Sequence, residues 1–424
     1  MWNLRKSLSR ICDKGEKRWL RKRVGNLRNL NGNILEKEKR KNDFMDAIII
    51  GAGPAGSSCA RRLAENGFSV KIYDRREELG IPVRCGEGLS ENTQELIGKI
   101  PANCISKKIK GARIYAPNGK YLEAVLKYGG LILNRRVFDK WLAEQAVKAG
   151  VEIQKNTLIT DFIKENGYYK GVRGKKIEEK AKMIVCATGA ESALRKSLNI
   201  FSKLNLIDSC LQYKMSEIDI DTDFIHIYLG NEIAPRGYCW VFPKGENKAN
   251  VGVGIIPGQK NAKYYLDKFI SERQELKKGE IDLIEGGCVP VGGLLKDVVD
   301  DGLLLCGEAA HHVNPIHGGG IKEAIISGQL AADVISDCLN KKDVSKKALS
   351  KFNELWWEKR GNKLKKVERL RETVEKLSDN DLNDLVEVLK PEDIIEFSRG
   401  SRLIILAKAL MRKPRLISLA KHLL

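Results

Sequence analysis

Apolar and polar residues alternate along the chain in patterns that predict strands in some regions and helices in others. The apolar run at residues 48–50 predicts a buried strand. Over residues 57–66, apolar side chains recur at helical spacing, and Gly67 follows as a stop signal. A second apolar run, residues 70–73, predicts another strand. A strand, a helix and a strand in this order are typical of a parallel sheet covered by helices.

The pattern then becomes β-rich before it returns to a helix. Residues 111–134 favour strands, with turn signals at 117–119 and 129–130. Residues 135–149 predict a helix, which Gly150 ends. Further strands are predicted at residues 151–160, 168–172 and 183–187.

The second half of the chain has a different character. From residue 205 to 285, aromatic and β-branched residues alternate with polar ones, which predicts an antiparallel sheet. A buried strand near residue 305 and a helix to about residue 339 resume the first pattern. We therefore predict a basic N-terminal extension (1–44), a nucleotide-binding domain in two parts (45–204 and 286–340), an inserted substrate domain (205–285) and a helical C-terminal region (341–424).

A glycine-rich loop joins the first predicted strand to the first helix. Gly51 permits a tight turn, Gly53 lets a pyrophosphate approach the backbone, and Gly56 lets helix and strand pack closely. Asp74, after the second strand, is placed to accept hydrogen bonds from ribose hydroxyls. The motif and its flanking elements together predict a dinucleotide site at a helix N-terminus.

The charge of the chain points to an anionic partner. The formal net charge is +20, which favours a lipid surface, nucleic acid or a phosphorylated substrate, or else reflects a solvated, Lys-rich surface. Residues 1–44 predict a basic amphipathic segment on an anionic membrane; the alternatives are a segment without fixed structure, or a true start at Met45. Residues 402–424 predict an interfacial helix pair broken by Pro414, or a core-packing helix with a basic outer face. We expect no nucleic-acid partner.

Cysteine and histidine placement argues against a metal site. The ten cysteines include no Cys-x-x-Cys spacing, which favours a reducing compartment. His311, His312 and His317 lack a nearby cysteine or acid pair, so we expect no metal. No apolar run reaches the roughly 18 residues that span a bilayer, and no secretory signal is visible. We therefore expect a cytoplasmic protein, held peripherally at the inner face of the cell membrane.

Further motifs suggest a binding cavity. The close spacing of proline, cysteine and glycine at residues 82–88 predicts a rigid loop whose glycines can approach a flat ligand. Tyr238, Trp240 and Phe242 alternate along one strand, so they point to one face. They could line an apolar slot, although spacing alone favours ordinary sheet core. The glycines at 318–320 precede a helix and predict a second cradle for an anion or carbonyl.

These motifs together resemble the geranylgeranyl reductase family of flavoproteins, which shares its fold with para-hydroxybenzoate hydroxylase. The resemblance covers about residues 45–330. Two of its motifs are specific to the family: Pro-Val-Arg-Cys-Gly-Glu-Gly at 82–88 and Tyr-x-Trp-x-Phe-Pro-x8-Gly-x-Gly at 238–254. The glycine loop at Gly51 and Gly-Glu-Ala-Ala…Gly-Gly-Gly-Ile at 307–321 occur in many flavoproteins. The resemblance implies an α/β fold: a Rossmann-like FAD-binding domain of the para-hydroxybenzoate hydroxylase type, an inserted antiparallel-sheet substrate domain and a helical C-terminus.

The resemblance also implies a function. Family members use FAD to reduce geranylgeranyl double bonds, and the archaeal members saturate the isoprenoid chains of membrane ether lipids. The Cys-Gly-Glu-Gly loop resembles this archaeal branch most. Reduction of a chlorophyll or quinone side chain, a flavin-dependent monooxygenase and a non-catalytic membrane-binding protein are the alternatives. Ferredoxin, NAD(P)H and a deazaflavin all remain candidates for the electron donor.

Site residues follow from the matching motifs. The isoalloxazine ring is expected between the Cys85 loop and the helix that starts near Gly319, and Cys85 is a candidate proton donor because a neutral thiol can donate. Tyr238, Trp240 and Phe242 are expected to line a tunnel for the polyprenyl chain. The implied FAD contacts are Gly51, Gly53, Ala55, Gly56, Asp74, Cys85, Gly86, Gly88, Arg135, Glu308, Gly320 and Ile321, with Ile159 as a weaker candidate for a backbone contact to adenine.

Two of these positions depart from the family pattern. Glu308 stands where the family usually has the aspartate that binds the ribityl part of FAD, and it is longer by one methylene. Asp74 stands where glutamate is more common, which is a milder change. FAD binding is still expected, with a changed local geometry at Glu308.

Overall fold

The computed structural model describes residues 44–424 apart from positions 193, 195–197, 199–207, 257, 259, 399, 402, 412–416 and 418–424. Residues 45–424 form one compact unit. The basic extension predicted for residues 1–44 lies outside the described residues, except for Phe44.

A parallel sheet is the centre of the nucleotide-binding part. Its central strand β1 (Met45–Ile50) pairs in parallel with β2 (Val70–Tyr73) and with β9 (Ile177–Cys186). Strand β16 (Leu303–Leu305) extends this sheet beside β9, and β6 (Glu152–Gln154) extends it beside β2, both in parallel. The carboxyl ends of these strands therefore lie along one edge, where such sheets bind ligands. The strands β7 (Ile159–Glu165), β8 (Tyr168–Gly174) and β15 (Val299–Asp300) complete it by antiparallel pairing.

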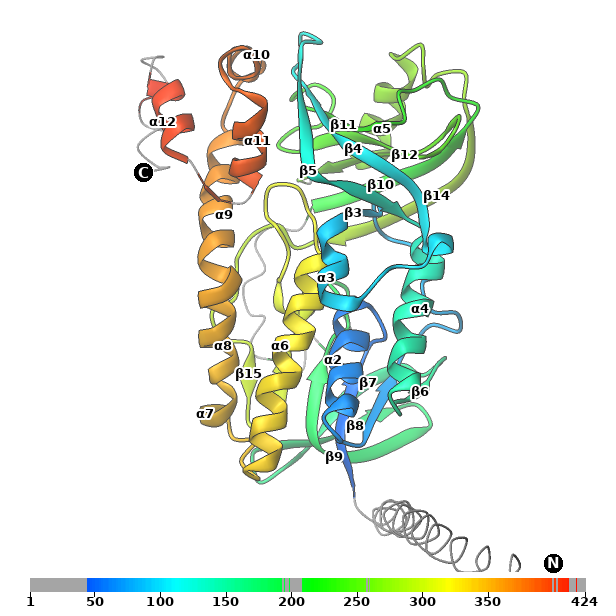
Figure 1. The fold of residues 1–424 in the computed structure, drawn as a ribbon, viewed down its shortest axis with the longest axis vertical. Coiled ribbons are helices and arrows are strands. Elements are labelled where there is room, and N and C mark those ends of the chain that lie inside the picture. The colour runs from blue at the N-terminus through cyan, green and yellow to red at the C-terminus, as the bar shows by residue number, and fades with distance from the viewer. Residues whose placement is uncertain are drawn as a thin grey trace, which may run out of the picture. The chain divides into compact units, whose positions relative to one another are not determined.

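Three helices stand side by side against this sheet in Figure 1: α2 (Pro54–Glu65), α4 (Arg135–Lys148) and α6 (Ile321–Asn340). Close contact between α2 and α6 depends on Gly328, because a Cβ there would lie 2.2 Å from the carbonyl oxygen of Ala55. The strands, α2 and α6 share one apolar core. This packing fixes the N-termini of both helices at the carboxyl edge of the sheet.

The second sheet has eight strands in the order β14-β10-β13-β12-β11-β4-β5-β3, and it lies at the upper right of Figure 1. It is larger than the predicted insertion at 205–285, because residues 88–133 contribute three of its strands. It is also not wholly antiparallel, because β11 pairs in parallel with β4. The strands are β3 (Gly88–Ser90), β4 (Ile105–Tyr115), β5 (Tyr121–Leu133), β10 (Asp208–Ser216), β11 (Phe224–Tyr228), β12 (Tyr238–Gly245), β13 (Lys248–Ile255) and β14 (Glu280–Val289).

One predicted turn is wrong. The turn expected at 117–119 does join β4 to β5, but Gly129 and Gly130 lie inside β5. A Cβ on Gly130 would lie 2.9 Å from the side chain of Ile109 on the neighbouring strand. Glycine here permits close approach within an irregular stretch of pairing rather than a reversal of the chain.

The C-terminal region is helical, as predicted. In α12 (Leu403–Met411), Leu406, Ala407 and Leu410 are buried in a cluster with other helices, and Lys408 is exposed. This matches the core-packing alternative for α12. The other helices of this region are α7 (Lys346–Leu349), α8 (Lys351–Trp356), the π-helical turn η7 (Trp357–Gly361), α9 (Asn362–Val374), α10 (Asp379–Val388) and α11 (Pro391–Ser398).

Within the part of the chain that the structure describes, the remaining helices are short, apart from α5 (Ala262–Ser271), which covers the outer face of the second sheet. They are η2 (Glu91–Thr93), α3 (Gln94–Ile97), η3 (Ala102–Cys104) and η6 (Gly307–Ala310). Within the described residues, no helix combines the length and apolar composition that crossing a bilayer requires.

Candidate active site

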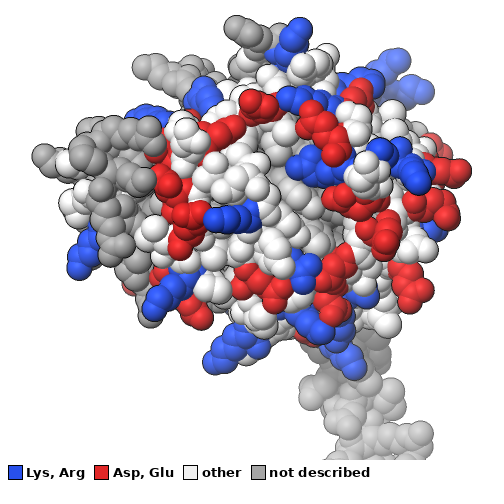
Figure 2. Space-filling view, turned by 90° about the horizontal axis from the view of Figure 1, so that it is seen from above, with Lys and Arg blue, Asp and Glu red and all other residues white. Residues whose placement is uncertain are grey.

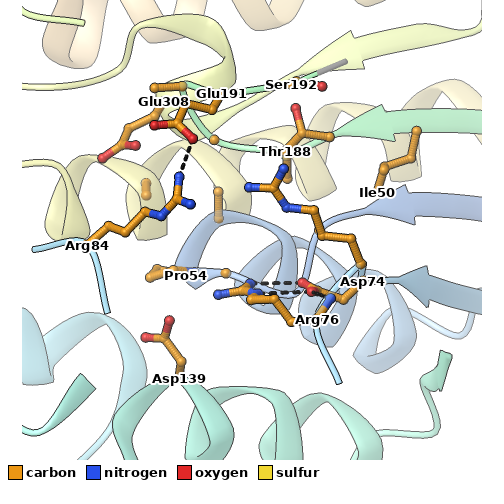
Figure 3. A pocket seen from close by; sticks show the side chains of 18 of the residues that line it. Ile50, Pro54, Asp74, Arg76, Arg84, Asp139, Thr188, Glu191, Ser192 and Glu308 are labelled. Carbon is orange, nitrogen blue, oxygen red and sulfur yellow. Dashed lines mark hydrogen bonds and ion pairs between the residues drawn. The ribbon is translucent and has the colours of Figure 1, made fainter. Parts of the chain in front are cut away.

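A cleft opens at the carboxyl edge of the parallel sheet, between the N-termini of α2 and α6 (Figure 3). It is lined by residues that follow β1, β2, β9 and β16. The predicted cofactor residues on its wall are Gly51, Gly53, Ala55, Asp74, Arg135, Ile159, Glu308, Gly320 and Ile321.

The glycine loop leaves room for a ligand at the first turn of α2. Gly51 has φ +106°, and a Cβ on Gly56 would lie 1.9 Å from the carbonyl oxygen of Gly51, so both positions need glycine for the turn and its packing. A Cβ on Gly53 would meet no heavy atom within 4 Å, because this residue faces the cleft. The first turn of α2 has neither a side-chain cap nor an acid. Its backbone N–H groups therefore suit the pyrophosphate of a dinucleotide.

Asp74 ends β2 with a buried carboxylate. Its Oδ2 accepts a 2.7 Å hydrogen bond from the backbone N–H of Ala52, and both its oxygens bond the guanidinium of Arg76 at 2.8 and 2.9 Å (Figure 3). Burial raises the pKa of Asp74, but the bonds and charge of Arg76 outweigh burial and leave the pKa below its ordinary value. The carboxylate is thus ionised and able to accept from ribose, in competition with Arg76.

The other end of the cleft is formed by Glu308 and the start of α6. Gly320 precedes this helix without a side-chain cap, and a Cβ on it would lie 3.0 Å from Oε1 of Glu308. Burial raises the pKa of Glu308, although the charge of Arg135 and the backbone N–H of Ala190 lower it in part. The side chain of Glu308 therefore reaches toward Gly320, and a larger residue than glycine at position 320 would lie too close to its carboxyl group.

An ion pair spans the cleft. Arg84, in the loop after β2, pairs with Glu191, in the loop after β9 (Figure 3). Both side chains are 41% exposed, so the pair contributes at most about 1 kcal/mol and can open when a ligand enters.

The Cys85 loop (residues 82–88) joins the cleft to the second sheet. Its residues 82–84 line the cleft wall, whereas Cys85, Gly86 and Gly88, which were predicted as cofactor contacts, do not. The ring of Phe242 would be 2.9 Å from a Cβ on Gly86 and 3.4 Å from one on Gly88, so these glycines let the loop touch the aromatic strand. Burial raises the pKa of the Cys85 thiol, although the charge of Arg135 and the N–H of Glu87 oppose it. The thiol is therefore neutral near pH 7 and carries a proton.

Glu87 anchors this loop. Its side chain is buried and accepts hydrogen bonds from Lys244 and from Asn250, each at 2.7 Å. Its other oxygen accepts the backbone N–H of Arg135 at 2.8 Å. The carboxylate thus holds β12, β13 and the first residue of α4 together.

Tyr238, Trp240 and Phe242 form a row on one face of β12, with ring centroids 5.9 and 6.3 Å apart. The alternate residues of β12, Cys239 and Val241, pack instead in the core beside α5. The aromatic row is therefore not part of that core, and it faces the Cys85 loop.

A buried polar network fixes the middle of this row. Trp240 donates its indole N–H to Gln212 at 3.2 Å. The amide of Gln212 in turn donates to the carbonyl of Cys85 at 3.2 Å and to Glu285 at 3.0 Å. Lys214 pairs with Glu285 at 3.0 Å. Because each member is bonded to the next, the indole and the loop are held in one arrangement.

Several of these residues were not predicted from the sequence. Glu87 lies inside a recognised motif, but its partner Lys244 is 157 positions away, so no local signal links them. Gln212 and Arg76 likewise show their role only through contacts. Among the residues that the structure describes, no group of three or more metal-ligating side chains lies close enough together to hold a metal ion.

Known families match both parts of the chain. A family model for the geranylgeranyl reductase catalytic domain matches residues 207–289, and one for an NAD(P)-binding Rossmann-like domain matches residues 49–101. A digeranylgeranylglycerophospholipid reductase from Methanocella arvoryzae is 39% identical over 82% of this chain and 92% of its own length. One from Methanosarcina acetivorans is 38% identical over 82% of this chain and 89% of its own length.

Solved structures agree with the fold. A geranylgeranyl bacteriochlorophyll reductase-like protein from Thermoplasma acidophilum superposes with a TM-score of 0.81 and 36% identity, covering 90% of this chain and all of that one. A flavin-dependent brominase superposes with a TM-score of 0.67 at 18% identity, covering 84% of this chain and 94% of that one. The brominase supports only the fold. The predicted fold class is confirmed.

The raised pKa of Glu308 predicts a pH dependence. The folded protein binds this proton more tightly than the unfolded chain, in which the pKa is about 4.5. The stability of flavin-free protein should fall as the pH rises from 4.5 through the raised pKa. Glu308→Gln has no titrating proton at this position. The difference between its melting temperature and that of wild type should therefore shift in favour of the variant by roughly 1–3 °C as the pH rises across the same range. Glu77→Gln, at an exposed position, is the control; a pH-independent difference for Glu308→Gln would contradict the role of burial.

Proposed function

This chain belongs to the digeranylgeranylglycerophospholipid reductase family, and we propose that it uses FAD bound in the cleft to saturate the geranylgeranyl chains of a membrane glycerophospholipid. It is an oxidoreductase of lipid biosynthesis that acts on carbon–carbon double bonds. The observation that carries the proposal is the meeting of the cleft, the Cys85 loop and the aromatic row at one place.

The residues of the cleft fit an extended dinucleotide flavin. The first turn of α2 would hold the pyrophosphate, and Asp74 would bond the adenosine ribose. Glu308 would accept from the ribityl chain, and the N-terminus of α6 would face the ring system. The cleft is lined both by Thr157 and Asp74 at one end and by the start of α6 at the other, which supports FAD over a mononucleotide.

The chemistry requires two hydrogens to reach an unpolarised alkene. When bound, the flavin supplies a hydride to one carbon. The protein must hold the double bond in position, exclude water and hold a proton for the other carbon. Tyr238, Trp240 and Phe242 supply an apolar wall for the prenyl chain, and the hydrogen bond from Trp240 to Gln212 keeps this wall in place.

Cys85 is the proposed proton donor. Its thiol is neutral because burial raises its pKa, and its carbonyl is fixed by Gln212. The bond from Glu87 N–H to Cys85 Sγ, 3.2 Å long, orients the sulfur. The thiol is thus held on the loop that touches the aromatic row.

Two alternative functions share these features. A monooxygenase of this fold would consume NAD(P)H and oxygen, and a reductase of a quinone or chlorophyll side chain would use the same apolar wall. The identity with digeranylgeranylglycerophospholipid reductases over most of the chain favours the phospholipid.

The principal test supplies electrons directly, so that the donor (ferredoxin, NAD(P)H or a deazaflavin) need not be known. Protein loaded with FAD and reduced by dithionite should add two hydrogens per double bond to a digeranylgeranylglyceryl phospholipid, measured by lipid mass. Geranylgeranyl diphosphate is the second substrate. Mass spectrometry of the heat-released cofactor should find FAD. If neither lipid gains mass, the reductase proposal is wrong; rapid oxygen uptake with NADPH would then support the monooxygenase.

Replacement of Cys85 tests the proton donor. Cys85→Ala should lower turnover about a hundredfold or more, because a positioned acid contributes roughly 10²–10⁴-fold, while the flavin spectrum stays unchanged. Cys338→Ala, a buried cysteine on α6 outside the site, should retain full turnover. Turnover of Cys85→Ala within a few-fold of wild type would assign the proton to another group.

We also propose that the basic termini hold the protein at an anionic membrane surface on the cytoplasmic side. Residues 1–44 contain 14 Lys and Arg against 5 Asp and Glu. On the face shown in Figure 2, Lys and Arg are interspersed with Asp and Glu, so the excess charge is not gathered there.

Sedimentation with anionic vesicles tests this attachment. Binding should fall steeply as salt rises, and it should weaken when the chain begins at Met45, since each basic residue near the surface contributes about 1 kcal/mol. A chain that ends at Met411 keeps the buried residues of α12 and tests the basic residues after it in the same way. Equal binding by all three chains, or binding that is insensitive to salt, would exclude a role for these segments.

A further inference from the structure

Arg371 of α9 is a buried cation whose hydrogen bonds are incomplete. The residue is 6% exposed, and its Nε and Nη2 atoms have no hydrogen-bond partner among the residues that the structure describes. Its Nη1 atom donates to Glu375, one turn further along the same helix. An unpaired buried guanidinium is costly, so an arginine kept in this state calls for an explanation.

The ion pairs around Arg371 contain more basic than acidic side chains. Glu375 also accepts a 2.9 Å bond from Arg236, so two guanidinium groups share one carboxylate. One turn before Arg371, Glu368 is occupied by the backbone N–H of Gly293 at 2.7 Å and by Lys365. In these ion pairs three basic side chains share two carboxylates, which favours an anionic ligand beside Arg371.

This cluster lies at one end of the aromatic row. Arg236 precedes Tyr238 by two residues, in a turn that docks on the end of α9 through a bond from Asn231 to the carbonyl of Leu377. Tyr238 donates to the carbonyl of His317 at 2.7 Å. At the opposite end of the row, Phe242 touches the Cys85 loop.

We propose that Arg371 and Arg236 form a binding site for the phosphate of the lipid substrate, with the prenyl chain running from there along the aromatic row toward Cys85. This inference rests on the function proposed above. Two guanidinium groups are well suited to phosphate because each presents parallel N–H donors to its oxygens. The side chain of Arg236 is 49% exposed, so the site is open to solvent on that side.

The geometry of β12 supports this direction of the chain. The strand positions from Arg236 to Phe242 span about 20 Å at roughly 3.3 Å per residue, a length that an extended prenyl chain can follow. A headgroup held at Arg371 would therefore leave double bonds within reach of the Cys85 loop. It would also keep the charged end of the lipid away from the apolar wall.

The test compares two lipids that differ only in the phosphate: digeranylgeranylglyceryl phosphate and digeranylgeranylglycerol. Arg371→Met keeps the volume and removes the charge, so KM for the phosphate lipid should rise about tenfold to a hundredfold, with kcat little changed. KM for the neutral lipid should equal that of wild type. Arg371→Lys should recover part of the loss. Arg369→Met, at an exposed position of the same helix, is the matched control and should behave as wild type.

Binding to the oxidised protein is measured in parallel from the change in flavin absorbance on titration with each lipid. This readout does not need turnover, so it decides the phosphate site even if wild type reduces neither lipid and the proposed function is wrong. Arg236→Gln is the second variant, because its exposed position spares the fold if Arg371→Met does not fold. It should weaken binding of the phosphate lipid alone.

Two outcomes would overturn the inference. In the first, Arg371→Met and Arg236→Gln weaken the binding of both lipids equally, or of neither lipid. The cluster would then have only a structural role. In the second, inorganic phosphate binds wild type but not the variants, while the two lipids are bound alike by all proteins. The site would then take a free anion rather than the lipid headgroup.

Discussion

The buried carboxylate of Glu87 is the interaction on which the rest of the site depends. It joins Lys244 and Asn250 of the second sheet to the first residue of α4 in the nucleotide-binding part. Removal of one partner would leave buried charge unpaired, which typically costs about 3–5 kcal/mol. Because Glu87 follows Cys85 by two residues, the same bonds that join the second sheet to α4 also fix the loop of the proposed proton donor.

The two acidic residues of the cleft, Asp74 and Glu308, have pKa values that their surroundings shift in opposite directions. Asp74 is held ionised by Arg76, whereas burial raises the pKa of Glu308. One end of the cleft therefore holds a carboxylate that stays ionised. At the other end, the charge of Glu308 depends on what fills the space beside Gly320, so binding of the proposed FAD would be linked to the protonation of Glu308.

Local features of this site could be predicted from the sequence, and distant contacts could not. The glycine loop and Asp74 belong to one continuous strand–helix–strand unit, so spacing alone indicated their positions. Two partners of Glu87, Lys244 and Asn250, lie more than 150 positions away, and no periodicity connects them to Glu87. The turn predicted at Gly130 was wrong because glycine marks either a turn or a close approach of backbones, and only the neighbouring Ile109 decides between them. For the same reason, the sequence pattern predicted strands within residues 88–133 but did not show that they pair with the second sheet.

The parallel pairing of β4 with β11 has a consequence for synthesis of the chain. Strand β5 ends at Leu133, and β11, which pairs with the other edge of β4, begins at Phe224. At a synthesis rate of roughly 5–20 residues per second, this edge of β4 therefore stays unpaired for about 5–20 s while the chain is being made. The parallel sheet waits longer, since β16 ends at Leu305. Unpaired edges are templates for aggregation, and long-range pairing is slow. The nascent chain is therefore most vulnerable before its last third emerges, and that interval is where chaperones would decide the yield of folded enzyme.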